Sequence, residues 1–168
     1  MEMECPFCQP DFTQFGSIDR KFYEDPYTLA MLSKGQDSRG YSLVVLKPHR
    51  ADLSISLYPT ERLYLMRTLN MIAARLKSKL GAKRIYVVSM CDGVEHLHFH
   101  LIPRYEWTDA DKQRYRELFT ERDGIESVNR QIEKNQIGGS WWLAEIERHP
   151  MIPNPTEDYF RKLLKELE

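Results

Sequence analysis

Histidines and apolar residues alternate strictly from His96 to Leu101, with Leu97 and Phe99 between the three histidines. Alternation at period two is typical of a β-strand that turns one face toward a core, because successive side chains point to opposite faces. The pattern predicts a strand beginning at His96, with its histidines on one face and roughly 6.5–7 Å apart. Clustered histidines are typical of catalytic or metal sites, so this strand is the first candidate site.

Three further stretches predict strands, at residues 27–32, 41–47 and 84–90. Residues 33–40 have the composition of a turn and join the first two, and Pro48 closes the second because it lacks a backbone N–H. The turn Cys91-Asp92-Gly93 joins residues 84–90 to the histidine strand. These two strands are expected to form a hairpin lying over a helix.

The longest helix is predicted between Pro59 and Gly81. Thr60 is the expected N-cap, Glu61 places a carboxylate in the first turn, and Gly81 suits the helix end. Apolar residues recur at helical spacing and form one face, which is expected to pack on a sheet or a dimer partner: Leu65, Leu69, Ile72, Ala73, Leu76 and Leu80.

The last third of the chain, residues 108–168, predicts a helical extension. Thr108 is the expected N-cap of a helix reaching residue 123, residues 138–142 suggest a break, and Thr156 is the expected cap of a last helix. That last helix has one apolar face, formed by Phe160, Leu163, Leu164 and Leu167. Trp141 and Trp142 are expected to anchor the extension to the core, and a place in the lining of a substrate cleft is the alternative.

Composition and charge narrow the class of protein. The chain has 168 residues, of which 42% are hydrophobic and 29% charged, which predicts one globular domain. A formal net charge of −1 argues against an extended nucleic-acid surface. The chain has no apolar run of about 18 residues and no signal-peptide pattern, so no membrane association is expected. Three cysteines do not suggest a disulfide framework, and a reducing, cytoplasmic location is expected.

Cys5 and Cys8 form a C-x-x-C motif close to the first residue. The motif can be half of a zinc site, a redox pair or two unrelated thiols. The redox interpretation requires a preceding strand, for which four residues leave little room. The zinc interpretation requires two more ligands from elsewhere in the chain, and His49 and His96 are the natural candidates.

The run from His96 to Ile102 resembles the His-φ-His-φ-His-φ-φ motif (φ, apolar) of the histidine triad (HIT) superfamily of nucleotide hydrolases and transferases. Residues 41–53 are similar to its strand-turn segment with a separate, earlier histidine, here His49, and residues 89–93 to the turn before the triad. The resemblance covers about residues 5–105. It implies an α+β fold, with an antiparallel sheet of about five strands, one long helix packed on the sheet, and the helical extension. On this interpretation residues 1–107 form the catalytic domain and residues 108–168 pack on it.

The resemblance also implies roles for particular residues. Cys5, Cys8, His49 and His96 would hold a structural zinc ion, as in HIT proteins with an N-terminal C-x-x-C, and no organic cofactor is expected. His98 would attack the α-phosphorus of a nucleotide and form a nucleotidyl-histidine. His100 would donate a hydrogen bond to the phosphoryl oxygens, and the backbone carbonyl of His96 would orient the His98 ring. A zinc ion with three protein ligands would instead favour a metal-hydroxide hydrolase.

The substrate stays open at this level. Dinucleoside polyphosphates, nucleoside phosphoramidates and nucleotide sugars all fit the motif, with Arg104 and Cys91 as candidate substrate contacts beside His100. Cys91 stands where one branch of the superfamily has a glutamine, and Ser33-Lys34 falls where many members have an acidic ribose-binding residue. The superfamily also implies a homodimer through the long helix and an edge strand. An inactive nucleotide-binding or scaffold protein is the alternative function, and a zinc-storage protein is a third.

Overall fold

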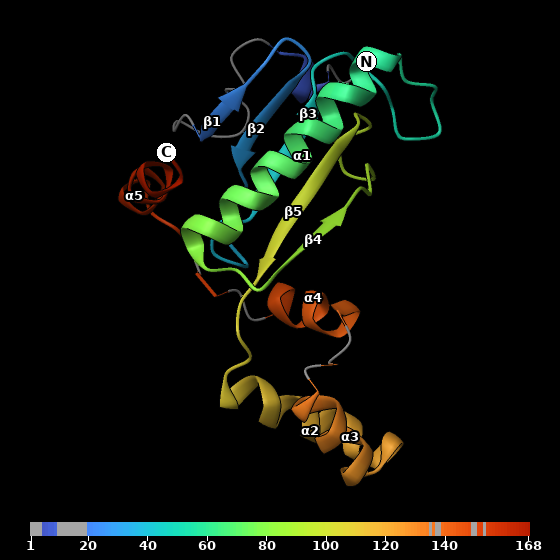
Figure 1. Ribbon diagram of the computed structural model, residues 1–168, viewed down its shortest axis with the longest axis vertical. Coiled ribbons are helices and arrows are strands. Elements are labelled where there is room, and N and C mark those ends of the chain that lie inside the picture. The colour runs from blue at the N-terminus through green and yellow to red at the C-terminus, as the bar shows by residue number, and fades with distance from the viewer. Residues whose placement is uncertain (1–4, 10–19, 135, 137–138, 149–150, 153) are drawn as a thin grey trace.

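The computed structural model describes residues 5–9, 20–134, 136, 139–148, 151–152 and 154–168. Its centre is a sheet in which all neighbouring strands run antiparallel, in the order β1-β2-β3-β5-β4. The strands are β1 (Lys21–Glu24), β2 (Thr28–Leu32), β3 (Ser42–Leu46), β4 (Arg84–Val88) and β5 (His98–Arg104). Helix α1 (Pro59–Leu80) lies diagonally across one face of this sheet (Figure 1). The predicted α+β fold, with five strands and one long helix, is confirmed.

The main core lies between α1 and the sheet. Leu69, Ile72 and Leu76 of the helix are buried against Val44 and Leu101 of the sheet. Burying a side chain of this size contributes about 1.5–3 kcal/mol, so this layer contributes a large part of the folding free energy. Helix α5 (Glu157–Leu167) extends the same core with Phe160, Leu163 and Leu167.

The first residues of α1 differ from the prediction. Tyr58 is the N-cap and Pro59 the first helical residue, so the assignment of Thr60 as N-cap was wrong. Proline suits this position because the first helical N–H has no partner inside the helix. The Glu61 carboxylate accepts the backbone N–H of Tyr58 at 2.9 Å and pairs with Arg50 at 2.7 Å. At the other end Gly81 has a φ of 73°, the left-handed conformation that glycine adopts without a steric penalty.

The histidine strand begins two residues later than the alternation predicts. Strand β5 starts at His98, so His96 lies before the strand and does not share a sheet face with His98 and His100. The backbone explains the difference. The N–H of Leu97 bonds to Arg50 O and its carbonyl accepts from Leu46 N, which spreads the pairing of one residue over five positions of the neighbouring segment. The regular hydrogen-bond ladder of β5 therefore begins at His98, and strand geometry does not fix the direction of the His96 side chain.

Strand β1 was not predicted from the sequence. It is an edge strand of four residues whose side chains are all exposed or half-buried, so no buried face imposes an alternating pattern on it. Its partner β2 is buried along its whole length. Apolar periodicity identifies strands that contribute to a core, and β1 contributes little.

Helices α2 (Asp109–Asp123), α3 (Ile125–Glu133) and α4 (Gly139–Arg148) form the other part of the extension. Thr108 caps α2 and Thr156 caps α5, as predicted. The break expected at residues 138–142 was wrong for residues 139–142, which open α4, and Gly138 lies outside the described residues. Helix α4 lies near the ends of β4 and β5, and α2 and α3 lie farther from the sheet (Figure 1).

A second apolar cluster joins these helices to the sheet. Trp142 is buried and its ring lies 5.6 Å from that of Tyr86 on β4. Other members of the cluster are Ile102, Trp107, Tyr115, Val128, Ile132 and Ile146. Trp142 therefore packs as an anchor between the extension and the sheet.

Among the described residues, no helix has the length and apolar character required to cross a bilayer.

Candidate active site and metal centre

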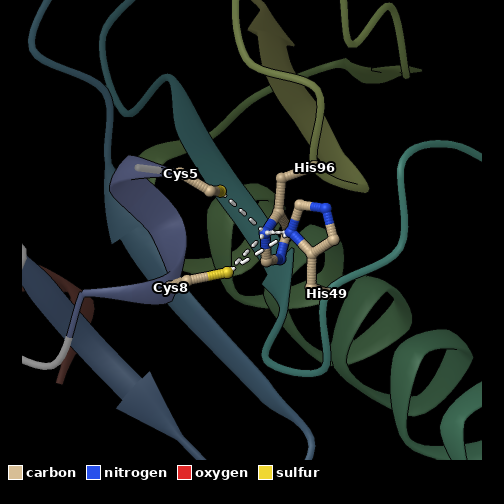
Figure 2. Close-up of side chains that lie close together, drawn as sticks. All are labelled: Cys5, Cys8, His49 and His96. Atoms are coloured by element: carbon tan, nitrogen blue, oxygen red, sulfur yellow. Dashed lines mark hydrogen bonds between the residues drawn. The ribbon is translucent and has the colours of Figure 1, made fainter. Parts of the chain in front are cut away.

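Four metal-ligand side chains from three distant segments meet at one end of the sheet. The short 3₁₀ helix η1 (Pro6–Cys8) and the residue before it supply Cys8 and Cys5, the segment after β3 supplies His49, and the segment before β5 supplies His96. Their side chains converge on one point (Figure 2). One ligand atom from each residue lies within 4.8 Å of the others. All four predicted metal ligands are thus brought together.

The spacing of these atoms fits tetrahedral zinc. His96 Nδ1 lies 3.2 Å from Cys5 Sγ, 3.5 Å from Cys8 Sγ and 3.2 Å from His49 Nδ1. Cys8 Sγ lies 3.3 Å from His49 Nδ1. Zinc bound to two sulfurs and two nitrogens separates its ligands by about 3.3–3.8 Å. A Cys₂His₂ donor set with these distances is suited to a closed, four-coordinate ion.

The protonation of His96 also suits a ligand. Its Nε2 lies 2.5 Å from the carbonyl oxygen of Leu46, which can only accept, so Nε2 carries the proton and Nδ1 has a free lone pair. Hydrogen bonding of the second ring nitrogen to a carbonyl is the usual arrangement for a metal-bound histidine. Burial of the side chain, which is 0% exposed, lowers the pKa of His96 and favours the neutral form. Burial and the neighbouring Cys5 raise the pKa of the Cys8 thiol to about 11, so without a metal this thiol keeps its proton at neutral pH.

The His98 ring is held by a hydrogen bond to the backbone of His96. Its Nδ1 donates to the carbonyl oxygen of His96 at 2.6 Å, which leaves Nε2 unprotonated in the neutral ring. The ring is 6% exposed and lies 5.0 Å from that of Phe7 in η1, while Ser89 Oγ donates to His98 O at 2.9 Å. An imidazole with a fixed tautomer and a free Nε2 lone pair is suited to act as a nucleophile.

His100 lies beside His98 on the same face, with ring centroids 4.8 Å apart. Burial, with a smaller contribution from the charge of His98, lowers the pKa of His100 to about 4, so the ring is neutral at pH 7. The hydroxyl of Tyr41 lies 2.6 Å from its Nδ1. When Tyr41 donates to Nδ1, the remaining His100 proton is on Nε2, where it can be donated to a phosphoryl oxygen.

Tyr41 is a site residue that sequence reasoning missed. It was assigned only to a strand, without a chemical role. The register explains its position: Leu43 pairs with His100, and Tyr41 lies two residues earlier, on the same face. Strand pairing is a long-range property, so the order of residues along one strand did not reveal this contact.

Two predicted substrate contacts have other neighbours in the structure. The Cys91 thiol lies 3.5 Å from Ser89 Oγ and donates to His96 O at 3.7 Å, the carbonyl that also holds His98. The Arg104 guanidinium is buried and stacks 4.8 Å from the centroid of the Trp107 ring, at the end of β5 next to the extension. The roles of Cys91 and Arg104 in binding substrate stay predictions.

The geometry agrees with a comparison against family models. A model described as the HIT domain matches residues 16–107, more than half of the chain, and the match includes His49, Tyr41 and the three histidines. The chain belongs to the HIT family. The match ends just before α2, so the helical extension lies beyond the HIT domain.

Solved structures show the same fold. A hypothetical histidine triad nucleotide-binding protein from Sulfolobus tokodaii aligns over 97% of this chain and 89% of its own, with 17% identity and a TM-score of 0.62. A HIT family protein from Bacillus subtilis covers 71% of this chain and 97% of its own, with 22% identity and a TM-score of 0.53.

A third solved structure with this fold contains zinc. A Zn-bound histidine triad family protein from Mycobacterium smegmatis is 25% identical over 64% of this chain and 79% of its own, with a TM-score of 0.52. A search of curated proteins finds no significant match.

Proposed function

We propose that this HIT protein is a nucleotide hydrolase or nucleotidyltransferase that works through a covalent nucleotidyl-histidine on His98. The observation that carries the proposal is the hydrogen bond of 2.6 Å from His98 Nδ1 to the His96 carbonyl. It fixes the one tautomer in which Nε2 can attack phosphorus, and it does so before substrate binds. A protein that only binds nucleotides has no need of a nucleophile held in this way.

The neighbouring residues supply the rest of the chemistry. His98 Nε2 attacks the α-phosphorus of an ester, anhydride or phosphoramidate, and the leaving group departs with the electron pair of the broken bond. His100, neutral and aligned by Tyr41, donates from Nε2 to a phosphoryl oxygen as negative charge builds there. Water or another acceptor then attacks the same phosphorus and frees His98, releasing the nucleotide.

We propose that the metal centre holds zinc and that the zinc is structural. Four protein ligands fill a tetrahedral shell, leaving no position for a reactive water. A bound zinc ion would tie η1 to His96 and would thereby steady the carbonyl that aligns His98. Cys5, Cys8, His49 and His96 would be its ligands, and we place no catalytic step on the metal.

We further propose a reducing, cytoplasmic setting. Cys5, Cys8 and Cys91 are free thiols, and two of them would have to stay reduced to bind zinc as thiolates.

A homodimer is the proposed assembly. Strand β4 is an edge strand, and large apolar side chains are exposed on it and on α1. Those side chains are Leu63 and Met66 on α1 and Val87 on β4, and Tyr58 just before α1 and Met90 two residues after β4 are exposed as well. An exposed apolar surface that includes an unpaired strand edge is suited to a second copy of the same chain.

Release of nucleoside monophosphate tests the proposed function. Diadenosine tetraphosphate and adenosine 5′-phosphoramidate would be offered separately, with His98→Ala as the inactive variant. We expect release from at least one substrate and its loss in His98→Ala, together with a mass increase of one nucleotidyl group on the wild-type chain after a quench in denaturant at alkaline pH, where a phosphorus–nitrogen bond is stable. Release that persists in His98→Ala would move the chemistry away from His98. Absence of release would favour the inactive nucleotide-binding protein.

A further inference from the structure

Two side chains from the segment after β4 bond to the backbone around the proposed nucleophile. Ser89 Oγ donates to the carbonyl oxygen of His98 at 2.9 Å, and the Cys91 thiol donates to that of His96 at 3.7 Å. Both side chains belong to half-buried residues, and their Oγ and Sγ atoms lie 3.5 Å apart. The residues on either side of Leu97 thus each have a side-chain donor on their carbonyl.

The end of the β4–β5 pairing explains why side chains bind these carbonyls. Strand β4 pairs with β5 as far as Val88, so the ladder stops two residues short of the position opposite His98. The chain then turns away, and Cys91 has a φ of 59°, a left-handed conformation that is uncommon for residues other than glycine. The Ser89 hydroxyl therefore binds the His98 carbonyl where the backbone ladder no longer continues.

These carbonyls matter because the His98 ring reaches back along its own strand. Its Nδ1 donates to the His96 carbonyl at 2.6 Å, so the bond joins a side chain to the backbone two residues earlier. A hydrogen bond weakens steeply when its angle is distorted. The bond therefore depends on the relative orientation of the His96 carbonyl and the His98 backbone.

Both neighbouring segments hold this stretch of backbone. On the β3 side, the N–H of Leu97 donates to Arg50 O at 2.5 Å, and its carbonyl accepts from Leu46 N at 3.1 Å. On the β4 side, Ser89 and Cys91 supply the contacts. Loss of the β4 contacts would leave the backbone around the nucleophile held from one side.

The hydroxyl and the thiol are donors of different strength. The Ser89 bond of 2.9 Å is in the normal range for O–H···O, whereas a thiol is a weak donor. The single Ser89 proton goes to His98 O, so the serine oxygen can only accept from the thiol. The thiol proton then has two acceptors in reach, Ser89 Oγ at 3.5 Å and His96 O at 3.7 Å. Ser89 should therefore contribute more than Cys91.

We propose that Ser89 is a positioning residue for the nucleophile and that Cys91 assists it. The proposal rests on the proposed function and adds two residues outside the histidine motif to that site. Both act through the backbone between His96 and His98. They keep the Nδ1 proton on the His96 carbonyl, which leaves Nε2 of His98 free for phosphorus.

Nitrogen NMR of the histidine rings tests the proposal. In the full chain labelled with ¹⁵N-histidine, two-bond correlation spectra show which ring nitrogen carries the proton, and His98→Ala identifies the His98 signals. The spectra are recorded at pH 8, above the ordinary imidazole pKa of about 6.5. We expect the single Nδ1–H tautomer of His98 in wild type and both tautomers in Ser89→Ala.

Steady-state kinetics of nucleotide release gives the second measurement. In Ser89→Ala we expect kcat to fall by about 3- to 10-fold, the effect of one neutral hydrogen bond, with KM changed by less than about twofold. Cys91→Ala should lower kcat by only about twofold, and Cys91→Ser, with a stronger donor, should not lower it.

Matched variants separate positioning from general effects on the fold. Ser89→Thr keeps the hydroxyl and should recover the tautomer and most of kcat. Ser78→Ala also removes a hydroxyl that donates to a backbone carbonyl, that of Arg75, but at an exposed position of α1. It should keep both wild-type values. Ser89→Cys keeps a weaker donor and should give an intermediate result, which decides the question if Ser89→Ala does not fold.

Several results would overturn the proposal. They are a wild-type His98 protonated on Nε2, a Ser89→Ala spectrum equal to that of wild type, and an unchanged kcat in Ser89→Ala. A higher KM in Cys91→Ala, with kcat and tautomer unchanged, would make the thiol a substrate contact and remove it from the proposal.

Failure of the proposed function gives a different result, which is no release of nucleotide by the wild-type protein. The NMR comparison requires no turnover, so it still decides whether Ser89 aligns the ring of His98. Both tautomers in Ser89→Ala, with one tautomer in wild type and Ser78→Ala, would support the alignment. The same single tautomer in all three proteins would reject it.

Discussion

At the scale of single residues, the chemistry of this site depends on which ring nitrogen carries a proton. Carbonyl oxygens accept from His96 Nε2 and His98 Nδ1, which leaves Nδ1 of the first for a metal and Nε2 of the second for phosphorus. Two histidines separated by one residue are thus suited to the two different roles proposed for them. Neither tautomer depends on a charged side chain, so both are set by the folded backbone.

Tyr41 is the third determinant of protonation at the site, and its removal is the first prediction. In Tyr41→Phe the His100 Nδ1 loses its donor at 2.6 Å, and the ring can hold its proton on either nitrogen. We expect kcat for nucleotide release to fall by about 10- to 100-fold, within the range of one positioned acid–base group, with little change in KM. Steady-state kinetics would measure this, and Tyr27→Phe, whose ring packs on Tyr64, is the control.

A higher KM with an unchanged kcat would contradict the positioning role of Tyr41. Replacing Tyr41 with histidine restores a hydrogen-bonding group in a smaller side chain. Partial recovery of kcat in Tyr41→His, relative to Tyr41→Phe, would support the hydrogen bond over simple filling of space.

The half-buried His100 makes stability depend on pH. Its pKa is about 4 in the folded state against 6.5 in the unfolded chain, so the unfolded state binds the extra proton first as pH falls. The stability that the neutral ring allows is therefore complete above pH 6.5 and is lost as pH falls toward 4. We expect His100→Gln to lose less stability than wild type between pH 7 and pH 4.5, by about 2 kcal/mol. Urea unfolding at both values would measure this, and equal losses would refute it.

Some residues of the candidate site could be predicted from the sequence and others could not. Cys5, Cys8, His49, His98 and His100 stand in recognisable spacings, so their grouping could be predicted from motif and resemblance. Tyr41 has no such spacing, because only the register of β3 on β5 brings it to His100. His96 was predicted on the wrong face, since alternation alone does not reveal where regular pairing ends.

At the scale of elements, the metal centre joins a short N-terminal segment to the sheet. Helix η1 has three residues and no side-chain cap hydrogen bond. Phe7 is buried beside His96 and His98, with ring centroids 5.6 and 5.0 Å away. A metal bound at Cys5 and Cys8 would therefore fix Phe7, a side chain that packs on His98, the proposed nucleophile.

Removal of the metal is the next prediction. We expect one zinc per chain by elemental analysis, and its loss in Cys8→Ser. The melting temperature should fall by roughly 10 °C in Cys8→Ser, because zinc binding contributes to the folding free energy. In a chain of this size 1 kcal/mol corresponds to about 2–4 °C, so this fall represents a loss of about 2.5–5 kcal/mol. Cys91→Ser changes the thiol outside the cluster and should keep both the zinc and the melting temperature. More than one zinc per chain would favour metal storage over a structural site.

Elements were predictable where they contribute a regular apolar face. Helices α1 and α5 do so, and their positions followed from periodicity. Strands β2 and β3 are buried on both faces, and their positions followed from apolar composition between turn residues. Helix α4 begins with glycine in a stretch that composition marks as a break, and its helical state depends on packing of Trp142 and Ile146 in the second cluster. Tertiary contacts of this kind override local propensity.

At the scale of the whole molecule, the extension and the proposed dimer surface occupy different parts of the protein. The extension packs through α4 on the site face and through α5 on α1, whereas the exposed apolar residues of α1 include Leu63 and Met66. Leu63 is 67% exposed and Met66 55%, and both lie in the N-terminal half of α1. A partner that covers Leu63 and Met66 would bury this apolar area of α1.

The oligomeric state follows from this arrangement as the last prediction. Light scattering after size-exclusion chromatography should give a mass near twice the chain mass of 19.9 kDa. Met66→Glu places a charge in the proposed interface and should shift the mass to that of one chain, because an unpaired charge is costly to bury. Leu118→Glu, at an exposed position of α2, is the matched control and should stay dimeric. A wild-type mass near one chain would refute the dimer and would show that β4 and α1 stay uncovered in solution.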